Sequence, residues 1–510
     1  MTPAPALGRL VGRGLAWGGA GALVLRFGNV LVGIVLARLL APEDFGVFAL
    51  ALAVQGVLVT IVDLGLSADL VRAREPLRLE PTVATISLVA GALMAGAMAA
   101  TAEPVARALG SERAAPVIAV LAATLVVSAA GVVPYARLQR AFQQREILLT
   151  GVIDLVVGTA VTVGLVLAGW GPMALAVSRL VAQPCATAAQ FVLTRTVPRF
   201  GYDRELARGA IAYGVPLAGA NLLSIALLSV DKVVLARVAG EEALGYYVLA
   251  FNVASWPMTA IGQTIRPVAL AAFARLDGRP EGAPPGAARP GAPPRAAPPG
   301  DGPGDGSGDG GLALATRLAW AAAVPVSCLL GATSAAVVVL LYGERWLPAA
   351  GALTALAAFG GARVLFDLFA TYLVARGATR PVLVVQAAWV VALVPAVVLG
   401  VRWWGPAGAG WAHVACALLV VLPLYLAAVR RSGADLRALG RALRLPLLAA
   451  VPTTAAAVLA ARAAGSPVVA LLAGGAAGAL VYLAVVGRSL LRTVGELRTA
   501  PAAPSPAVLP

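Results

Sequence analysis

Two stretches of the chain repeat one phrase, LARLLAPEDFGVFALA at Leu36–Ala51 and LARVAGEEALGYYVLA at Leu235–Ala250. Each copy lies between two long apolar runs. Alanines and leucines would align by chance in so apolar a chain, but the polar, glycine and aromatic markers also align, at one common offset. The matching pairs are Arg38 with Arg237, Glu43 with Glu242, Gly46 with Gly245, and Phe48 with Tyr247. The repeat indicates two homologous halves, an organisation that is common in polytopic membrane proteins.

The composition predicts a membrane protein. Hydrophobic residues make up 60% of the 510 residues and charged residues 12%, and the mean hydropathy is +0.87, whereas a soluble domain carries about 25% charged residues. The apolar runs leave room for about 14 spans of about 20 residues each. They are too long for the alternating ten-residue strands of a barrel, so we expect helices. The predicted fold class is an all-α polytopic membrane protein.

The apolar runs group into two sets of six spans and a final pair. We expect an N-terminal segment at 1–16, a first bundle at 17–210, a second bundle at 211–430, the final helix pair at 431–497 and a disordered tail at 498–510. Residues 278–311 interrupt the second set with a stretch dominated by Pro and Gly that has no apolar face. Such a composition predicts a disordered cytoplasmic loop, either a tolerated insertion or a docking segment for a partner.

The arginines predict which loops face the cytoplasm. The chain has a formal net charge of +15, and the loops on the same side as Arg9 and Arg13 hold most of the arginines, as the positive-inside rule requires for the cytoplasmic side. Both termini are therefore expected in the cytoplasm, with the protein in the cytoplasmic (inner) cell membrane. The positive charge is explained by contact with membrane lipids, and it gives no indication of nucleic-acid binding.

Signatures of enzymes and cofactors are missing from the sequence. The single His413 has no neighbouring Glu, and the three cysteines lie in apolar runs, where a thiol is normally a small buried hydrophobic group. Lys232 is the only lysine, so a phosphate-binding loop of the ATPase type is excluded. We expect no catalytic residue, no metal and no cofactor.

Polar residues inside the predicted spans are the candidate functional groups, because each central charge costs at least about 2.5–3.5 kcal/mol to insert. Several follow steps of three and four residues and form polar stripes on single helix faces. The candidates for lining a cavity are Arg26, Asn29, Arg179, Asn221, Ser224, Lys232, Asn252, Ser255, Thr259, Gln263, Arg266 and Arg363. The candidate carboxylates for ion coupling are Asp63, Asp231 and Asp367.

Structural explanations of these residues stay open. Asp231, Lys232 and Arg266 are near helix ends, where long side chains reach the headgroups. Arg363 and Asp367 are four residues apart and could neutralise each other. The stripes could also join helices through hydrogen bonds. A hydrated cavity with more cations than carboxylates explains all of them together, and it suits an anionic substrate that carries phosphate groups.

Five segments of the chain carry a family resemblance: VGIVLARLLAPEDFGVFALALAVQGVLVTIVDLGLSADLVR (Val32–Arg72), PYARLQRAFQQRE (Pro134–Glu146), GWGPMALAVSRL (Gly169–Leu180), the segment Val230–Leu276 and LYGERWLPAAGAL (Leu341–Leu353). Through them the chain resembles the polysaccharide transporter, or O-antigen flippase, family of the multidrug/oligosaccharidyl-lipid/polysaccharide exporter superfamily. The resemblance covers most of the chain through the tenth span.

The resemblance implies two pseudo-symmetric six-helix bundles around a central cavity, with two further C-terminal helices. It also implies flipping of a polyprenyl-diphosphate-linked oligosaccharide by alternating access, coupled to an ion gradient, together with other polysaccharide-assembly proteins. Two alternatives remain. One is a cation or drug exporter of the same superfamily, and the other is a membrane-embedded polysaccharide polymerase or ligase.

Overall fold

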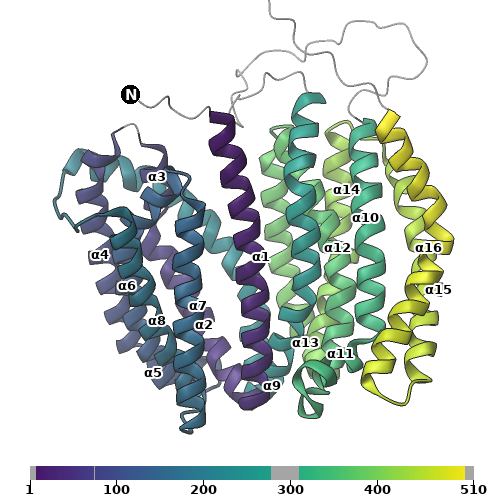
Figure 1. Ribbon diagram of the computed structural model, residues 1–510, viewed down its shortest axis with the longest axis horizontal. Helices are drawn as coiled ribbons and strands as arrows, with labels where there is room; N and C mark the ends of the chain where they lie inside the picture. Colours follow the sequence, from purple (N-terminus) through teal and green to yellow (C-terminus); the bar gives the residue numbers. More distant parts are fainter. Residues whose placement is uncertain (1–6, 74, 277–308, 500–510) are drawn as a thin grey trace, which may run out of the picture. The chain divides into compact units, whose positions relative to one another are not determined.

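The computed structural model describes residues 7–73, 75–276 and 309–499, and every regular element in those ranges is a helix (Figure 1). The first eight are α1 (Leu7–Leu39), α2 (Pro42–Asp63), α3 (Leu66–Arg72), α4 (Pro76–Ala100), α5 (Ala102–Leu109), α6 (Ala114–Arg140), α7 (Gln144–Leu167) and α8 (Pro172–Thr194). The others are α9 (Arg204–Leu276), α10 (Asp309–Ala332), α11 (Ser334–Tyr342), α12 (Ala349–Ala375), α13 (Thr379–Cys416), α14 (Leu422–Arg431), α15 (Leu436–Arg462) and α16 (Pro467–Thr499). Two short pieces complete the series, a 3-10 turn at Glu344–Trp346 and a π-helical turn at Ala417–Val421.

The predicted fold class is confirmed. Within the described residues, nine helical segments are long and apolar enough to cross a membrane. The total of about 14 spans stays a prediction. Most of the predicted loop at 278–311 and of the tail at 498–510 lies outside the described residues, although α10 begins at Asp309 and α16 ends at Thr499. Helix α1 begins at Leu7, inside the segment that we expected to precede the first span.

Proline and glycine explain where several helices begin and turn. Helices α2, α4, α8 and α16 each begin at a proline, whose fixed φ suits the first helical turn, where its missing N–H has no partner to lose. Helix α9 turns at Gly240, whose φ of 86° is strained for other residues. Helix α13 turns at Trp404 and Gly405. Each of the two turns separates two long apolar runs of the sequence.

The apolar runs at 46–71 and 312–342 each predict one span, but each is divided in the structure. The first lies in α2 and α3, because Leu64 and Gly65 adopt left-handed backbone angles between them. The second lies in α10 and α11, which meet at Thr333. In each half, one apolar run of the sequence is therefore longer than any single helix that it forms.

The chain forms two compact units. The first comprises Met1–Val248, Leu341–Gly343 and Val401–Pro406, and the second comprises Leu249–Leu340, Glu344–Gly400 and Ala407–Pro510. The beginning of the second repeat lies in the first unit, because the first part of α9 packs directly on the α2–α3 turn. An added Cβ at Gly214 would overlap the carbonyl oxygen of Leu64.

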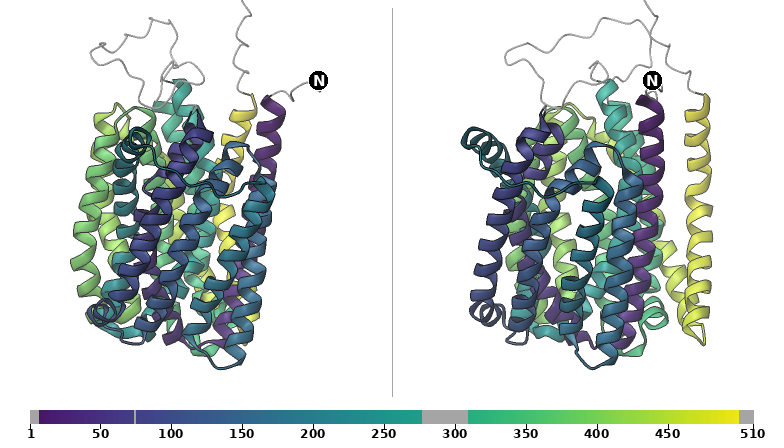
Figure 2. Two further views of the ribbon diagram at one scale, coloured as in Figure 1. Left: turned by 90° about the vertical axis from the view of Figure 1, so that its left-hand side faces the viewer. Right: turned by 60° about the vertical axis from the view of Figure 1, so that its left-hand side comes forward.

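Within the first unit, α6 packs against α2, α4 and α8, and α7 packs against α1 and α8. A buried cluster formed by α3, α4 and α6 includes Leu66, Leu70, Val83 and Val132. Within the second unit, α10 packs against α12, α15 and α16 (Figure 2). Among the nine apolar segments, α12 has the largest share of buried residues, 72% of its most apolar stretch, compared with 11% for α7. Polar residues on α12 therefore lie in the most buried of these segments.

The two copies of the repeated phrase contact each other reciprocally. An added Cβ at Gly46 would overlap the Glu241 carbonyl oxygen, and an added Cβ at Gly245 would overlap the Pro42 carbonyl oxygen. Gly46 and Gly245 hold the same place in the repeat, as do Pro42 and Glu241. The N-terminal end of α2 and the chain just after the Gly240 turn therefore meet as pseudo-twofold equivalents, at a distance that only glycine allows.

An ion-pair cluster ties the same region to α6. The Arg113 guanidinium lies 3.1 Å from an Asp44 carboxylate oxygen and 3.3 Å from a Glu241 carboxylate oxygen. One arginine from outside the repeat thus links a carboxylate of each copy.

Two other positions of the repeat carry polar residues in the second copy and apolar residues in the first. The Tyr247 hydroxyl donates a hydrogen bond of 2.5 Å to Asp231, whose side chain is 1% exposed. The positions that match these residues in the first copy are Phe48 and Val32, and both pack against one apolar cluster. The two positions are therefore apolar in the first copy, and in the second copy they are joined by a hydrogen bond.

Replacing Gly46 with Ala is expected to lower the thermal unfolding temperature of the purified protein, because the new methyl group must displace backbone, at a cost on the order of 1–3 kcal/mol. Gly56→Ala on the same helix is the matched control, since nothing lies within 4 Å of its added Cβ. We expect Gly56→Ala to be neutral or stabilising. Equal melting temperatures for the two variants would contradict the close contact.

Tyr247→Phe is expected to destabilise the protein by about 1–3 kcal/mol, because the buried Asp231 carboxylate loses a donor. The double variant Asp231→Val/Tyr247→Phe reproduces the first copy, so its loss should be smaller than the sum of the two single losses. Melting curves of the four proteins in one detergent measure this coupling. Strictly additive losses would show that the two side chains do not act as a pair.

Candidate functional site

A polar cavity lies between the second part of α9 and α12, entirely within the second unit. Its volume is about 220 Å³. Its walls combine aromatic and aliphatic groups with two hydroxyls, one guanidinium and one carboxylate. The residues that line it include Phe251, Ser255, Met258, Thr259, Phe359, Gly360, Arg363 and Asp367.

Helical spacing places these groups on facing sides of the two helices. Ser255 and Thr259 are four residues apart on α9, and Arg363 and Asp367 are four residues apart on α12, so each pair shares one helix face. Gly360 allows the two helices to approach, because a Cβ there would lie 2.6 Å from the Met258 Cγ. The structure thus brings together four of the residues that the sequence singled out.

The Arg363 side chain is half-buried in the most buried helix of the unit. Across the residues that the structure describes, it makes no hydrogen bond and no ion pair, and it is not paired with Asp367. The two charges, which the sequence left open as a self-neutralising pair, therefore form no ion pair in this conformation. A guanidinium inside a membrane helix requires water or an anion in place of a protein partner.

The two hydroxyls are held by their own helix. The Ser255 hydroxyl donates to the Phe251 carbonyl oxygen at 2.6 Å, and the Thr259 hydroxyl donates to the Ser255 carbonyl oxygen at 2.7 Å. Each oxygen retains acceptor capacity toward the cavity. The cavity can therefore accept hydrogen bonds from hydroxyls and donate hydrogen bonds to an anion.

Other predicted cavity residues lie elsewhere or are described only by their backbone. Arg26 is half-buried on α1, and Asn29 on the same helix donates to the Leu25 carbonyl oxygen at 2.7 Å. Arg179 is exposed on α8. Asn221 and Asn252 are exposed on α9. The structure does not describe the side chains of Ser224, Gln263 and Arg266.

The remaining candidates for ion coupling have structural contacts in the first unit. Asp231 accepts the Tyr247 hydroxyl and also the Lys232 backbone N–H at 2.8 Å. Asp63 accepts the Ser67 backbone N–H at 3.4 Å, close to the left-handed turn between α2 and α3. Of the three carboxylates, Asp367 alone lines the polar cavity.

Sequence reasoning missed the contacts that join distant segments. Neither Arg113 nor the buried pair of Glu80 and Arg137 was singled out, because each has its partner at least 57 residues away. The described residues contain no group of three or more His, Cys, Asp or Glu that could hold a metal ion. His413 is buried, and its ring centroid lies 4.8 Å from that of Phe359.

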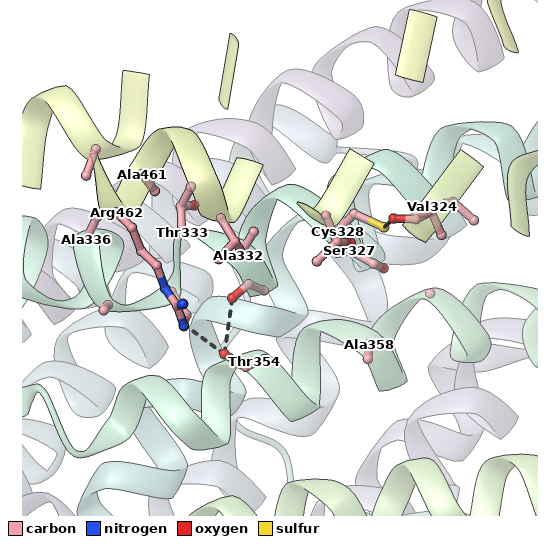
Figure 3. Close-up of a pocket in the computed structure, with 18 of the residues that line it drawn as sticks. Val324, Ser327, Cys328, Ala332, Thr333, Ala336, Thr354, Ala358, Ala461 and Arg462 are labelled. Carbon is pink, nitrogen blue, oxygen red and sulfur yellow. Dashed lines mark hydrogen bonds between the residues drawn. The ribbon is translucent and has the colours of Figure 1, made fainter. Parts of the chain in front are cut away.

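A larger cavity of about 700 Å³ lies on another face of α12, between α10, α12 and α15. Its walls are mostly small and apolar, and Ser334 and Thr354 share a hydrogen bond of 2.8 Å near Arg462 (Figure 3). None of the predicted site residues lines it. Its chemistry suits hydrocarbon more than sugar or diphosphate.

A family model described as "Polysaccharide biosynthesis protein" matches residues 35–282. The chain is 27% identical over 245 residues to the succinoglycan biosynthesis transport protein ExoT of Rhizobium meliloti (strain 1021), covering 48% of this chain and 49% of that protein. It is 26% identical over 256 residues to the lipopolysaccharide biosynthesis protein WzxC of Escherichia coli (strain K12), covering 48% of this chain and 51% of that protein. The chain thus spans about half the length of the curated relatives that it matches.

Solved structures match over more of the chain. The lipid II flippase MurJ in an inward closed conformation has a TM-score of 0.72 at 11% identity, covering 94% of this chain and 99% of that one. An inward-facing multidrug resistance MATE family transporter of the MOP superfamily has a TM-score of 0.61 at 16% identity, covering 80% and 94%. The chain therefore has the fold of these two transporter structures, and its residues 35–282 match the family model described as "Polysaccharide biosynthesis protein".

Proposed function

We propose that the protein flips a polyprenyl-diphosphate-linked oligosaccharide across the cytoplasmic membrane for the synthesis of a surface polysaccharide. The observation that carries the proposal is the half-buried Arg363 guanidinium, which lines the polar cavity and has no hydrogen-bond or ion-pair partner among the residues that the structure describes. A guanidinium presents paired N–H groups to the oxygens of a phosphate. The diphosphate is the part of such a substrate that this group would hold.

The other cavity groups fit the sugar part. Ser255 and Thr259 offer oxygens to sugar hydroxyls, and the aromatic rings of Phe251 and Phe359 offer apolar faces. The names of the two curated relatives, which refer to succinoglycan transport and to lipopolysaccharide synthesis, support this substrate class. Arg26, Arg179, Lys232 and Arg266 remain proposed contributors to a cationic path for the diphosphate.

Alternating access coupled to an ion gradient is the proposed mechanism, with both termini in the cytoplasm. Asp367 is the carboxylate that we assign to ion coupling, because it is exposed in the same cavity as Arg363. A cation or proton bound at Asp367 would make the net charge of the cavity more positive where the diphosphate binds. Binding of the ion and of the substrate would thereby be linked.

A cation exporter is the second candidate, because Asp367 could bind a cation directly in the same cavity. Arg363, which lies on the same helix face, opposes that reading by repelling cations. A polymerase or ligase has less support, since one curated relative is named as a transport protein.

Arg363→Gln is expected to reduce flipping of a lipid-linked oligosaccharide in proteoliposomes by at least about tenfold, the loss expected when one charge-assisted hydrogen bond to phosphate is removed. Arg363→Lys keeps the charge but loses the fork, so its rate should be intermediate. Arg380→Gln, an exposed arginine outside the cavity, is the matched control. Exchange of an organic cation but not of the oligosaccharide by the unmodified protein would instead favour the exporter.

Asp367→Asn is expected to abolish the stimulation of flipping by an imposed proton or sodium gradient while leaving slow exchange without a gradient. The amide cannot bind a proton or a cation as a carboxylate does. Rates measured with and without the gradient test this expectation, and Asp63→Asn serves as the comparison, because its carboxylate lies outside this cavity. Full gradient stimulation of Asp367→Asn would remove Asp367 from the mechanism.

A further inference from the structure

A separate cavity lies in the first unit, at the ends of α4, α6 and α8 that the arginine distribution assigns to the cytoplasm. Its volume is about 450 Å³, which is within the usual range of ligand sites. Helices α4 and α6 form two walls, and the segment after α8 forms the third. It shares no residue with the polar cavity of the second unit.

Hydrogen bonds hold the third wall in place. The Gly201 backbone N–H donates to the Thr85 hydroxyl at 3.1 Å, and the Asp203 backbone N–H donates to the Thr82 hydroxyl at 3.2 Å. At the other end of the segment, Arg195 ends α8 with left-handed backbone angles, φ 50° and ψ 38°. The wall is therefore fixed across α4 by specific contacts.

The mouth of the cavity carries two uncompensated positive charges. Glu80 is 8% exposed and pairs with Arg137, which donates from Nε to Glu80 at 2.6 Å and makes a second bond from its terminal nitrogen. This bidentate pair neutralises itself. Arg195 and Arg199 also line the cavity, are exposed, and make no side-chain hydrogen bond or ion pair with any residue in the described ranges.

The interior of the cavity is apolar. The lining residues of α4 extend from Leu77 to Leu88, about 16 Å along the helix at 1.5 Å per residue. Ala84, Ala129 and Val133 continue the apolar surface away from the arginines. The cavity is thus cationic at the membrane surface and apolar toward the hydrocarbon.

We propose that this cavity is a binding site for an anionic phospholipid of the cytoplasmic leaflet. The phosphate diester meets Arg195 and Arg199, and one acyl chain lies along α4 toward Leu88. Charge complementarity selects an anionic lipid over a zwitterionic one, and the apolar depth selects a lipid over a soluble phosphate. The site does not depend on the transported substrate.

The test is native mass spectrometry of the full chain, purified with phosphatidylglycerol and phosphatidylcholine present in equal amounts. We expect selective retention of phosphatidylglycerol, and at least about tenfold less retention by Arg195→Gln/Arg199→Gln, which removes two charge-assisted contacts. The matched control is Arg204→Gln/Arg208→Gln, which removes the same charge from exposed arginines outside the cavity. Equal retention by the two double variants would overturn the proposal.

Ala84→Trp tests the apolar part, because it fills the cavity while leaving both arginines in place. Reduced retention by this variant supports an acyl chain between α4 and α6, and unchanged retention excludes it. Glycerol phosphate alone is expected not to bind. Binding of glycerol phosphate as tight as that of the lipid, or equal displacement of phosphatidylglycerol by a polyprenyl diphosphate, would overturn the assignment to a phospholipid.

Discussion

The backbone contact between the two copies of the repeated phrase is the constraint on which the first unit depends. Gly46 and Gly245 each face a carbonyl oxygen of the other copy, so neither position can carry a side chain without moving backbone. The contact places the Gly240 turn of α9 beside the start of α2 and brings Asp44 and Glu241 within reach of one arginine, Arg113. Helix α9 then continues into the second unit, where its Ser255 and Thr259 meet α12.

A charged residue on the buried helix α12 lowers the stability of the fold, although the proposed function requires it. A helix with most of its surface inside the protein gains stability from apolar residues, and it loses stability from each charge that lacks a partner. The chain nevertheless places Arg363 in the middle of this helix, beside a cavity. Under the proposed function, the surrounding apolar contacts maintain the fold and the guanidinium binds the substrate.

The sequence predicted the helical fold class and four residues of one cavity, because helical spacing puts Arg363 and Asp367 on one face, as it does Ser255 and Thr259. The sequence could not predict which polar helix faces pack against each other, since that depends on contacts between distant segments. The pairing of Glu80 with Arg137 and the bridge from Arg113 to Asp44 are contacts of that kind. Short breaks within apolar runs were also missed, because Leu64 gives no sign in the sequence of its left-handed backbone.

At one pair of positions, the two halves of the repeat differ in polarity. The first half has Val32 and Phe48, and the second half has Asp231 and Tyr247 in their places. An aspartate in place of Val32, with Phe48 unchanged, would lack the hydroxyl donor that Tyr247 gives to the buried Asp231. The halves have consequently ceased to be interchangeable. A dimer of two first halves would regain symmetry but would lack the buried carboxylate.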